Sequence, residues 1–264
     1  MKKLTIITIN FNHLEGLKRT IDSIVNQTFT DYEWIVVDGG STDGSRQLLE
    51  QYQEHFAWWC SESDKGVYNA MNKGLLRATG EYVNFMNSGD VFANPTILAE
   101  IFYKPHDADV LYGIMTRGTI DGEYNNKLLL KSQINWWDFY VCTFNHQATF
   151  TRRILFEQYG GYDESYKALA DWRHFAELIC VQRVSYEYLP FIVAVYEGNG
   201  ISDDISVFPE EILRVRREIY PALQPSDLVE LQVIDMCNRY WLPRQLYRII
   251  TRGLVRILHI FNIE

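Results

Sequence analysis

Polar residues follow each of the first four apolar runs of this chain, at the point where each run ends. Asn10 follows the first run, Asp38 the second, Asp64 the third, and Asn87 and Asp90 follow the fourth. Carboxylates and amides in such a set can hydrogen-bond a base or a ribose, hold a divalent cation or take up a proton. Each of them alone is equally well explained as a turn or helix-cap residue, so their chemistry depends on whether the fold brings them together.

The four apolar runs have the length and composition of buried strands, and apolar residues between the runs recur at helical spacing. Strands are expected at 4–9, 34–37, 56–60 and 82–86, and helices at 15–26, 41–52 and 66–78. This alternation predicts an α/β fold with a mostly parallel sheet and helices on both faces. Ligands of such sheets bind outside the carboxyl ends of the strands. The polar residues are therefore expected along one edge, where Gly39 and Gly40 let the backbone approach a neighbour closely.

The second half of the chain is expected to extend this sheet. Segments 108–117 and 123–130 flank an Asp-Gly pair, which is a hairpin signal. Two further strands are expected at 184–189 and 191–196, divided at Pro190 because proline cannot donate a ladder hydrogen bond. From residue 210 onward the pattern is helical.

The last part of the chain contains four arginines at strict four-residue spacing: Arg244, Arg248, Arg252 and Arg256. Apolar side chains cover much of the remaining helix surface, which is typical of a basic amphipathic helix over 244–261. Such a helix suits contact with an anionic membrane surface. A helix packed on the domain or across a homodimer explains the pattern equally well.

Composition excludes several classes of protein. The 264 residues are 47% hydrophobic and 22% charged, as in globular proteins, and a net charge of −9 disfavours nucleic-acid binding. The four cysteines form no C-x-x-C pair, which argues against a zinc site and fits a reducing compartment. Neither a signal peptide nor a membrane-spanning run is expected, so we predict a cytoplasmic protein. Neither G-x-G-x-x-G nor a P-loop motif occurs.

Four segments of the chain together resemble the family 2 glycosyltransferases, which have the GT-A fold. They are "TIITINFNHLEGLKRTIDSIVNQTFTDYEWIVVDGGSTDGS", "SESDKGVYNAMNKGLLRATGEYVNFMNSGD", "FNHQATFTRR" and "GGYDESYKALADW". The resemblance implies a nucleotide-diphosphate sugar donor, Mg²⁺ or Mn²⁺ as cofactor, and inverting transfer to a saccharide or lipid-linked acceptor. The chain is similar to bacterial enzymes of capsule, exopolysaccharide or O-antigen assembly. A lipid-linked acceptor, together with the basic helix, would suit a cytoplasmic protein peripheral to the inner face of the membrane.

The resemblance also divides the chain. It implies a catalytic domain over 1–209, with donor binding in 1–90 and the acceptor and catalytic part in 91–209. A helical extension would follow over 210–264. The glycine-rich segment 196–202 resembles the loop that closes over the donor in this family.

The resemblance implies roles for ten residues. Asp171 would be the catalytic base and Asp90 the metal ligand. Donor binding would fall to eight residues: Thr8, Asn10, Asp38, Asp64, Lys65, Asn87, Ser88 and His146. Two departures from the family pattern stand out: the usual D-x-D motif is replaced by Asn-Ser-Gly-Asp with one carboxylate, and Ala170 stands where a glutamate often precedes the catalytic aspartate.

Other interpretations remain open at this stage. Asp171 precedes a helical pattern and has the position of an ordinary N-cap, and His146 fits a structural histidine as well as a ligand of diphosphate or acceptor. A sugar nucleotidyltransferase is the rival enzyme, although the glycine-rich phosphate loop of that class is missing after the first strand. The single carboxylate also suggests a non-catalytic nucleotide-sugar binder.

Overall fold

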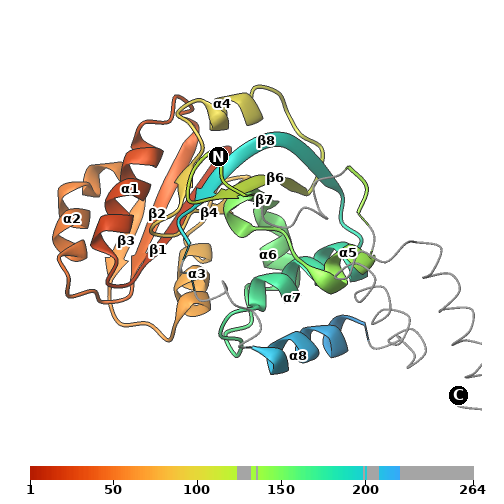
Figure 1. Cartoon of the computed structure of the whole chain (residues 1–264). Coiled ribbons are helices and arrows are strands. Elements are labelled where there is room, and N and C mark those ends of the chain that lie inside the picture. Colours follow the sequence, from red (N-terminus) through yellow and green to blue (C-terminus); the bar gives the residue numbers. More distant parts are fainter. Residues whose placement is uncertain (124–131, 135, 199, 201–207, 221–264) are drawn as a thin grey trace, which may run out of the picture. The chain divides into compact units, whose positions relative to one another are not determined.

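The computed structural model describes residues 1–123, 132–134, 136–198, 200 and 208–220. Its first half alternates strands and helices as predicted (Figure 1). The strands are β1 (Leu4–Asn10), β2 (Tyr32–Asp38), β3 (Trp58–Ser61) and β4 (Tyr82–Phe85). The helices between them are α1 (Leu14–Val25), α2 (Ser45–Gln51) and α3 (Val67–Leu75), with the short 3-10 turn η1 (Gln53–His55) after α2. The pairs β1–β2, β1–β4 and β2–β3 are all parallel.

The second half contributes the remaining strands of one mixed, mostly parallel sheet. They are β5 (Val91–Phe92), β6 (Val110–Arg117), β7 (Thr149–Arg152) and β8 (Tyr186–Tyr196). Within the described residues the strand order is β3-β2-β1-β4-β7-β6-β8-β5. β7 is antiparallel to both β4 and β6, whereas β6 and β8 are parallel. The sheet of the first half therefore continues directly into that of the second.

Most helices of the second half lie between these strands in the sequence. They are α4 (Ile97–Ile101), α5 (Trp136–Val141), α6 (Arg153–Tyr159), α7 (Ala170–Ala176) and α8 (Pro209–Ile219). A 3-10 turn, η3 (His146–Ala148), leads into β7, and a π-helical turn, η4 (Glu177–Val181), continues α7. The chain forms two compact units, Met1–Val215 and Arg216–Glu264, and the second is described only as far as residue 220.

Side-chain alternation along β1 explains how helices cover both faces of the sheet. Leu4 and Ile6 are fully buried in a cluster with apolar residues of α1 and α2. Ile7 points to the opposite face, because successive strand residues alternate, and lies against Gly74 of α3. A Cβ at Gly74 would overlap the side chain of Ile7. The glycine thus lets α3 pack close to the strand whose end contributes to the site.

Three predicted features differ in the structure. β8 runs through Pro190 without a break, because the exposed proline sits where the pairing with β6 shifts register, between Tyr112 and Ile114. α2 begins only at Ser45, since Gly44 before it has a left-handed φ of 100°. Of the predicted strand 123–130, only Glu123 is described, and the segment 244–261 lies outside the described residues.

Among the helices that the structure describes, none is both long and apolar enough to cross a bilayer.

Candidate active site

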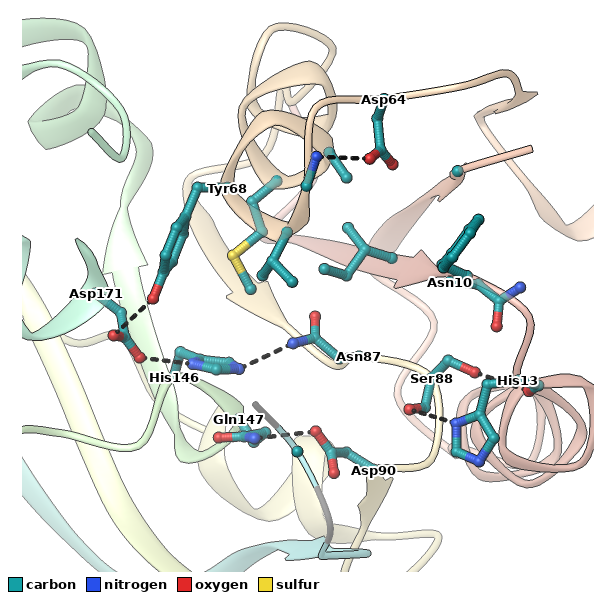
Figure 2. A pocket seen from close by; sticks show the side chains of 18 of the residues that line it. Asn10, His13, Asp64, Tyr68, Asn87, Ser88, Asp90, His146, Gln147 and Asp171 are labelled. Carbon is teal, nitrogen blue, oxygen red and sulfur yellow. Dashed lines mark hydrogen bonds and ion pairs between the residues drawn. The ribbon is translucent and has the colours of Figure 1, made fainter. Parts of the chain in front are cut away.

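A cavity of about 590 Å³ lies where β1 and β4 end, bounded by the loops after β2, β3 and β8 and by the start of α7 (Figure 2). Its volume falls within the range of small-molecule sites. Seven of the ten residues predicted from the sequence line it: Asn10, Asp64, Asn87, Ser88, Asp90, His146 and Asp171. The fold therefore gathers residues from both halves of the first compact unit around one hollow.

Asp38 does not reach the cavity surface but organises the strand ends behind it. Its fully buried carboxylate accepts hydrogen bonds from Asn10 Nδ2 at 2.7 Å, Ser61 Oγ at 2.6 Å and the backbone N–H of Ser41 at 3.0 Å. Burial raises the pKa of Asp38, but these hydrogen bonds and that of the Ser41 hydroxyl outweigh it and hold the pKa below its usual value. An ionised Asp38 thus joins β1, β2 and β3 and orients Asn10, which does line the cavity.

Two other predicted donor residues also lie away from the cavity. Thr8 is fully buried, and its hydroxyl accepts a hydrogen bond from Trp34 Nε1 at 3.0 Å. The Lys65 side chain is exposed and does not line the hollow. The contact of these two residues with a donor stays a prediction.

Each of the two glycines after β2 is needed for a different structural reason. A Cβ at Gly39 would lie 2.7 Å from Asp64 Oδ2 and 3.1 Å from the Phe11 ring, so only glycine lets these groups meet. Gly40 has a φ of 83°, which side chains rarely adopt. Asp64 itself is fixed by a 2.8 Å hydrogen bond from the backbone N–H of Gly66.

Asp90 lines the cavity from the turn between β4 and β5. Its Oδ2 accepts a hydrogen bond from Gln147 Nε2 at 2.9 Å and its Oδ1 one from the backbone N–H of Glu197 at 3.3 Å. Burial is the main cause that raises the pKa of Asp90 to about 6, against the opposing effects of Gln147 and His146. Asp90 leads directly into a strand, so it does not act as a helix cap.

Asp90 offers a carboxylate to a divalent cation, but most ligands of such a cation would have to come from a bound molecule and water. Within the described residues no three His, Cys, Asp or Glu side chains lie close enough to hold an ion by themselves. The side-chain oxygen of Asn87 is buried without a hydrogen-bond partner, and Asn87 lines the same cavity as Asp90. A carboxylate and an amide oxygen, completed by phosphate oxygens and water, suit Mg²⁺ or Mn²⁺.

Asp171 lies inside the first turn of α7, and the N-cap position belongs to Leu169, so the N-cap interpretation is wrong. Its Oδ1 accepts hydrogen bonds from the backbone N–H of Trp172 at 2.8 Å and from the Tyr68 hydroxyl at 3.2 Å. Its Oδ2 lies 3.0 Å from His146 Nδ1, and His146 Nε2 lies 3.1 Å from Asn87 Nδ2. Figure 2 shows the contacts that run from Tyr68 through Asp171 and His146 to Asn87 as one chain.

Tyr68, on α3, was not identified from the sequence, where its position appeared only as part of a helical pattern. It is 5% exposed and lines the cavity. Burial and then the charge of Asp171 hold the pKa of Tyr68 well above its usual value, so it remains a neutral donor. No sequence signal links it to Asp171, which lies 103 residues away.

Glu197, the first residue after β8, was likewise not identified individually. Its carboxylate pairs with Arg19 of α1 and lies 3.3 Å from His13 Nε2. A Cβ at Gly89 would overlap this carboxylate, and Gly89 has a φ of 102°. Glycine is therefore required where the turn that carries Asp90 meets the segment after β8.

Helix α8 holds the loop that leads into α7. The Glu211 carboxylate accepts hydrogen bonds from three successive backbone N–H groups, those of Lys167 at 2.6 Å and of Ala168 and Leu169 at 3.1 Å each. One turn further on, Arg214 Nη2 donates to Asp163 Oδ2 at 2.9 Å. Ala168 and Asp171 both line the cavity. The contacts of α8 therefore hold the backbone segment that carries part of the cavity wall.

A mixed, mostly parallel sheet with a polar cavity at its carboxyl edge is the arrangement of GT-A sugar transferases. The sequence pattern described as "Glycosyl transferase family 2" matches residues 5–160, and the chain belongs to this family. A "PGL/p-HBAD biosynthesis glycosyltransferase" of Mycobacterium bovis is 30% identical over 263 residues, covering 95% of this chain and 93% of the relative.

Solved structures confirm the fold. S. aureus TarS 1–349 in complex with UDP-GlcNAc superimposes with a TM-score of 0.67 at 19% identity, covering 92% of this chain and 74% of TarS 1–349. The mannosyltransferase PcManGT from Pyrobaculum calidifontis, in complex with GDP-Man and Mn²⁺, superimposes with a TM-score of 0.60 at 16% identity. The match covers 97% of this chain and 80% of PcManGT. The predicted family and GT-A fold are therefore confirmed.

Proposed function

We propose that this protein is an inverting glycosyltransferase that moves a sugar from a nucleotide-diphosphate sugar to a hydroxyl of a saccharide or lipid-linked saccharide. One observation carries the proposal: Asp90 and Asp171, from different halves of the first compact unit, line the same cavity. Uridine is the proposed base and bacterial surface polysaccharide synthesis the proposed setting. The UDP-sugar in the TarS complex supports the choice of uridine, and the name of the mycobacterial relative supports a biosynthetic role in bacteria.

The proposed reaction is a direct displacement at the anomeric carbon. The acceptor hydroxyl attacks from one side while the diphosphate leaves from the other, so the site needs a base on one side and neutralisation of charge on the other. Asp171 and its hydrogen-bond partners provide the basic centre. Asp90 and Asn87 would hold Mg²⁺ or Mn²⁺, which when bound supplies charge neutralisation for the leaving diphosphate. The remaining polar lining residues, Asn10, Asp64 and Ser88, would orient the donor.

A donor panel tests the proposed activity. We would incubate the protein with UDP-glucose, UDP-galactose, UDP-N-acetylglucosamine or GDP-mannose, with Mn²⁺ and bacterial lipid extracts, and measure release of nucleotide diphosphate. Release that depends on the extract is expected with at least one UDP-sugar. No release with any donor, together with tight binding of one, would instead identify a non-catalytic binder, the alternative suggested by the single carboxylate of the Asn-Ser-Gly-Asp turn.

Calorimetry tests the proposed metal dependence. UDP is expected to bind the wild-type protein more tightly with Mn²⁺ than with chelator, and Asp90→Ala is expected to abolish this difference. An unchanged Mn²⁺ effect in the variant would refute the role of Asp90. Membrane-surface contact through 244–261, an inner-face location and a homodimer remain predictions, because that segment lies outside the described residues.

A further inference from the structure

We propose that Tyr68 is a positioning residue that orients the Asp171 carboxylate, so that Oδ2 of Asp171 is the atom that takes the proton of the acceptor hydroxyl. The inference rests on the proposed function, because it concerns the base of the proposed sugar transfer. It deepens that function by naming one oxygen of Asp171 and the side chain from another helix that selects this oxygen. Tyr68 itself neither gains nor loses a proton in this role.

The Asp171 carboxylate needs neighbours that fix its orientation. The last torsion of an aspartate side chain has broad preferences, so the backbone position alone does not determine where the two oxygens point. Asp171 lines the cavity, and 15% of its side chain is exposed. A substrate hydroxyl can therefore reach the carboxylate, and the hydrogen bonds around it decide which oxygen that hydroxyl meets.

The donors around Asp171 leave one acceptor position open. An ionised carboxylate accepts about four hydrogen bonds, two at each oxygen. Oδ1 accepts two, from the Tyr68 hydroxyl at 3.2 Å and from the backbone N–H of Trp172 at 2.8 Å. Among the described residues Oδ2 faces a single group, His146 Nδ1 at 3.0 Å. The open position is therefore on Oδ2, because Tyr68 fills the corresponding position on Oδ1.

Tyr68 and Trp172 connect Asp171 to different parts of the fold. The N–H of Trp172 belongs to α7, as Asp171 does, so this contact moves together with the carboxylate. Tyr68 lies in the first turn of α3, which packs closely on β1 where Gly74 meets Ile7. The Tyr68 hydroxyl therefore fixes the base relative to the sheet whose strand ends line the cavity.

The Tyr68 ring is held from a second side by Tyr162. The two ring centroids lie 5.5 Å apart, and Tyr68 is 5% exposed. Asn72, one turn further along α3, donates from Nδ2 to the Tyr162 carbonyl at 2.8 Å and accepts from the Tyr162 N–H at 2.9 Å. A Cβ at Gly161 would overlap Asn72 Oδ1, so glycine permits this pairing. These contacts hold the ring so that its hydroxyl points to Asp171 (Figure 2).

The proposed step balances without any further reactant. The acceptor oxygen uses a lone pair to form the bond to the anomeric carbon, and its proton moves to Asp171 Oδ2. The bond from the anomeric carbon to the diphosphate oxygen breaks, and its electron pair stays on the diphosphate. Tyr68 keeps its own proton and its hydrogen bond to Oδ1 throughout. Asp171 returns the transferred proton to water after the product leaves.

Removal of the Tyr68 hydroxyl tests the inference. In the assay with the donor and extract that give the highest nucleotide release, Tyr68→Phe is expected to lower kcat at least about tenfold, since it loses a hydrogen bond to a charged group. The apparent KM for the acceptor in the extract should stay within about threefold of wild type, because Tyr68 acts through Asp171 and not on the acceptor. The affinity for UDP, measured by calorimetry, should also be unchanged.

Tyr162→Phe is the matched control. The Tyr162 hydroxyl is buried beside the Tyr68 ring and has no hydrogen-bond partner within the described residues. Its removal should therefore leave kcat within about twofold of wild type. Crystal structures of the wild type and both variants give a measurement that does not depend on activity. The Asp171 carboxylate should be turned about its last torsion in Tyr68→Phe and should superimpose on the wild type in Tyr162→Phe.

Four results would each overturn the inference. They are a loss in kcat below about tenfold in Tyr68→Phe, a rise in apparent KM that accounts for the whole loss, an equal loss in Tyr162→Phe, or an Asp171 carboxylate whose orientation Tyr68→Phe leaves unchanged. Each leaves the proposed glycosyltransferase activity standing. That activity fails by a different result, the absence of nucleotide release with every donor, and the crystal structures still decide the role of Tyr68 in that case.

Discussion

Acidification is expected to destabilise the first compact unit through His174, one turn along α7 from Asp171. His174 is 3% exposed, stacks on Phe156 with ring centroids 4.9 Å apart, and has no hydrogen-bond partner for Nε2 within the described residues. Burial is the main cause that lowers its pKa from 6.5 to about 3. The folded protein therefore keeps this imidazole neutral at pH values where the unfolded chain protonates it.

The sign and size of the effect follow from this difference. A depressed folded-state pKa contributes stability above the unfolded pKa of 6.5, and that stability is lost as the pH falls toward 3. At pH 5 the unfolded imidazole is about 1.5 pH units below its pKa, which is roughly 2 kcal/mol of lost stability relative to pH 8. The variant His174→Phe keeps a ring for the stack with Phe156 but cannot titrate.

Urea unfolding of both proteins at pH 8, 6 and 5 measures the effect. Other groups that titrate in this range, including Asp90 with its pKa of about 6, are present in both proteins and cancel in the comparison. The free energy of unfolding of the wild type should fall by about 2 kcal/mol more than that of His174→Phe between pH 8 and pH 5. Parallel pH profiles of the two proteins would refute the reasoning.

Three further outcomes are expected. Asp171→Asn should fold and bind UDP as the wild type does but lose about 10²–10⁴-fold in kcat, and near-normal turnover would contradict its role. Gly89→Ala should weaken Mn²⁺-dependent UDP binding measured by calorimetry, because a Cβ there meets the Glu197 carboxylate and the φ is 102°; unchanged affinity would count against that contact. Asp38→Asn should cost about 1–3 kcal/mol in urea unfolding, because the buried donors at one of the two carboxylate oxygens would face an NH₂ group instead of an acceptor, and a variant as stable as the wild type would show that the charge of Asp38 is not needed to join the strands.

The first half of the fold could be predicted because its signals are local. Apolar runs of strand length alternate with helical spacing up to residue 86, and parallel pairing follows from that order. The second half depends on contacts distant in sequence, such as β7 between β4 and β6, which no local pattern encodes. Pro190 shows the limit of a local rule, because a register shift in the sheet accommodates it without ending the strand.

The site could be predicted in part for a similar reason. The rule that polar residues at strand ends face a common edge located Asn10, Asp64 and Asp90. It did not show that Asp38 lies behind the cavity lining, because sequence cannot show that Ser41 and Ser61 enclose this carboxylate. The same rule could not predict the hydrogen bonds around Asp171, because helix α3 and the turn before β7 meet α7 only in the folded chain.

The carboxylate of Glu211 has a practical consequence for anyone who shortens this chain. A fragment ending at residue 209, the predicted domain boundary, would leave three adjacent amides before α7 without their acceptor, although the sheet would be whole. Such a fragment should still fold yet hold its proton-transfer residues loosely. The shortest useful enzyme therefore extends at least through Val215, where the first compact unit ends.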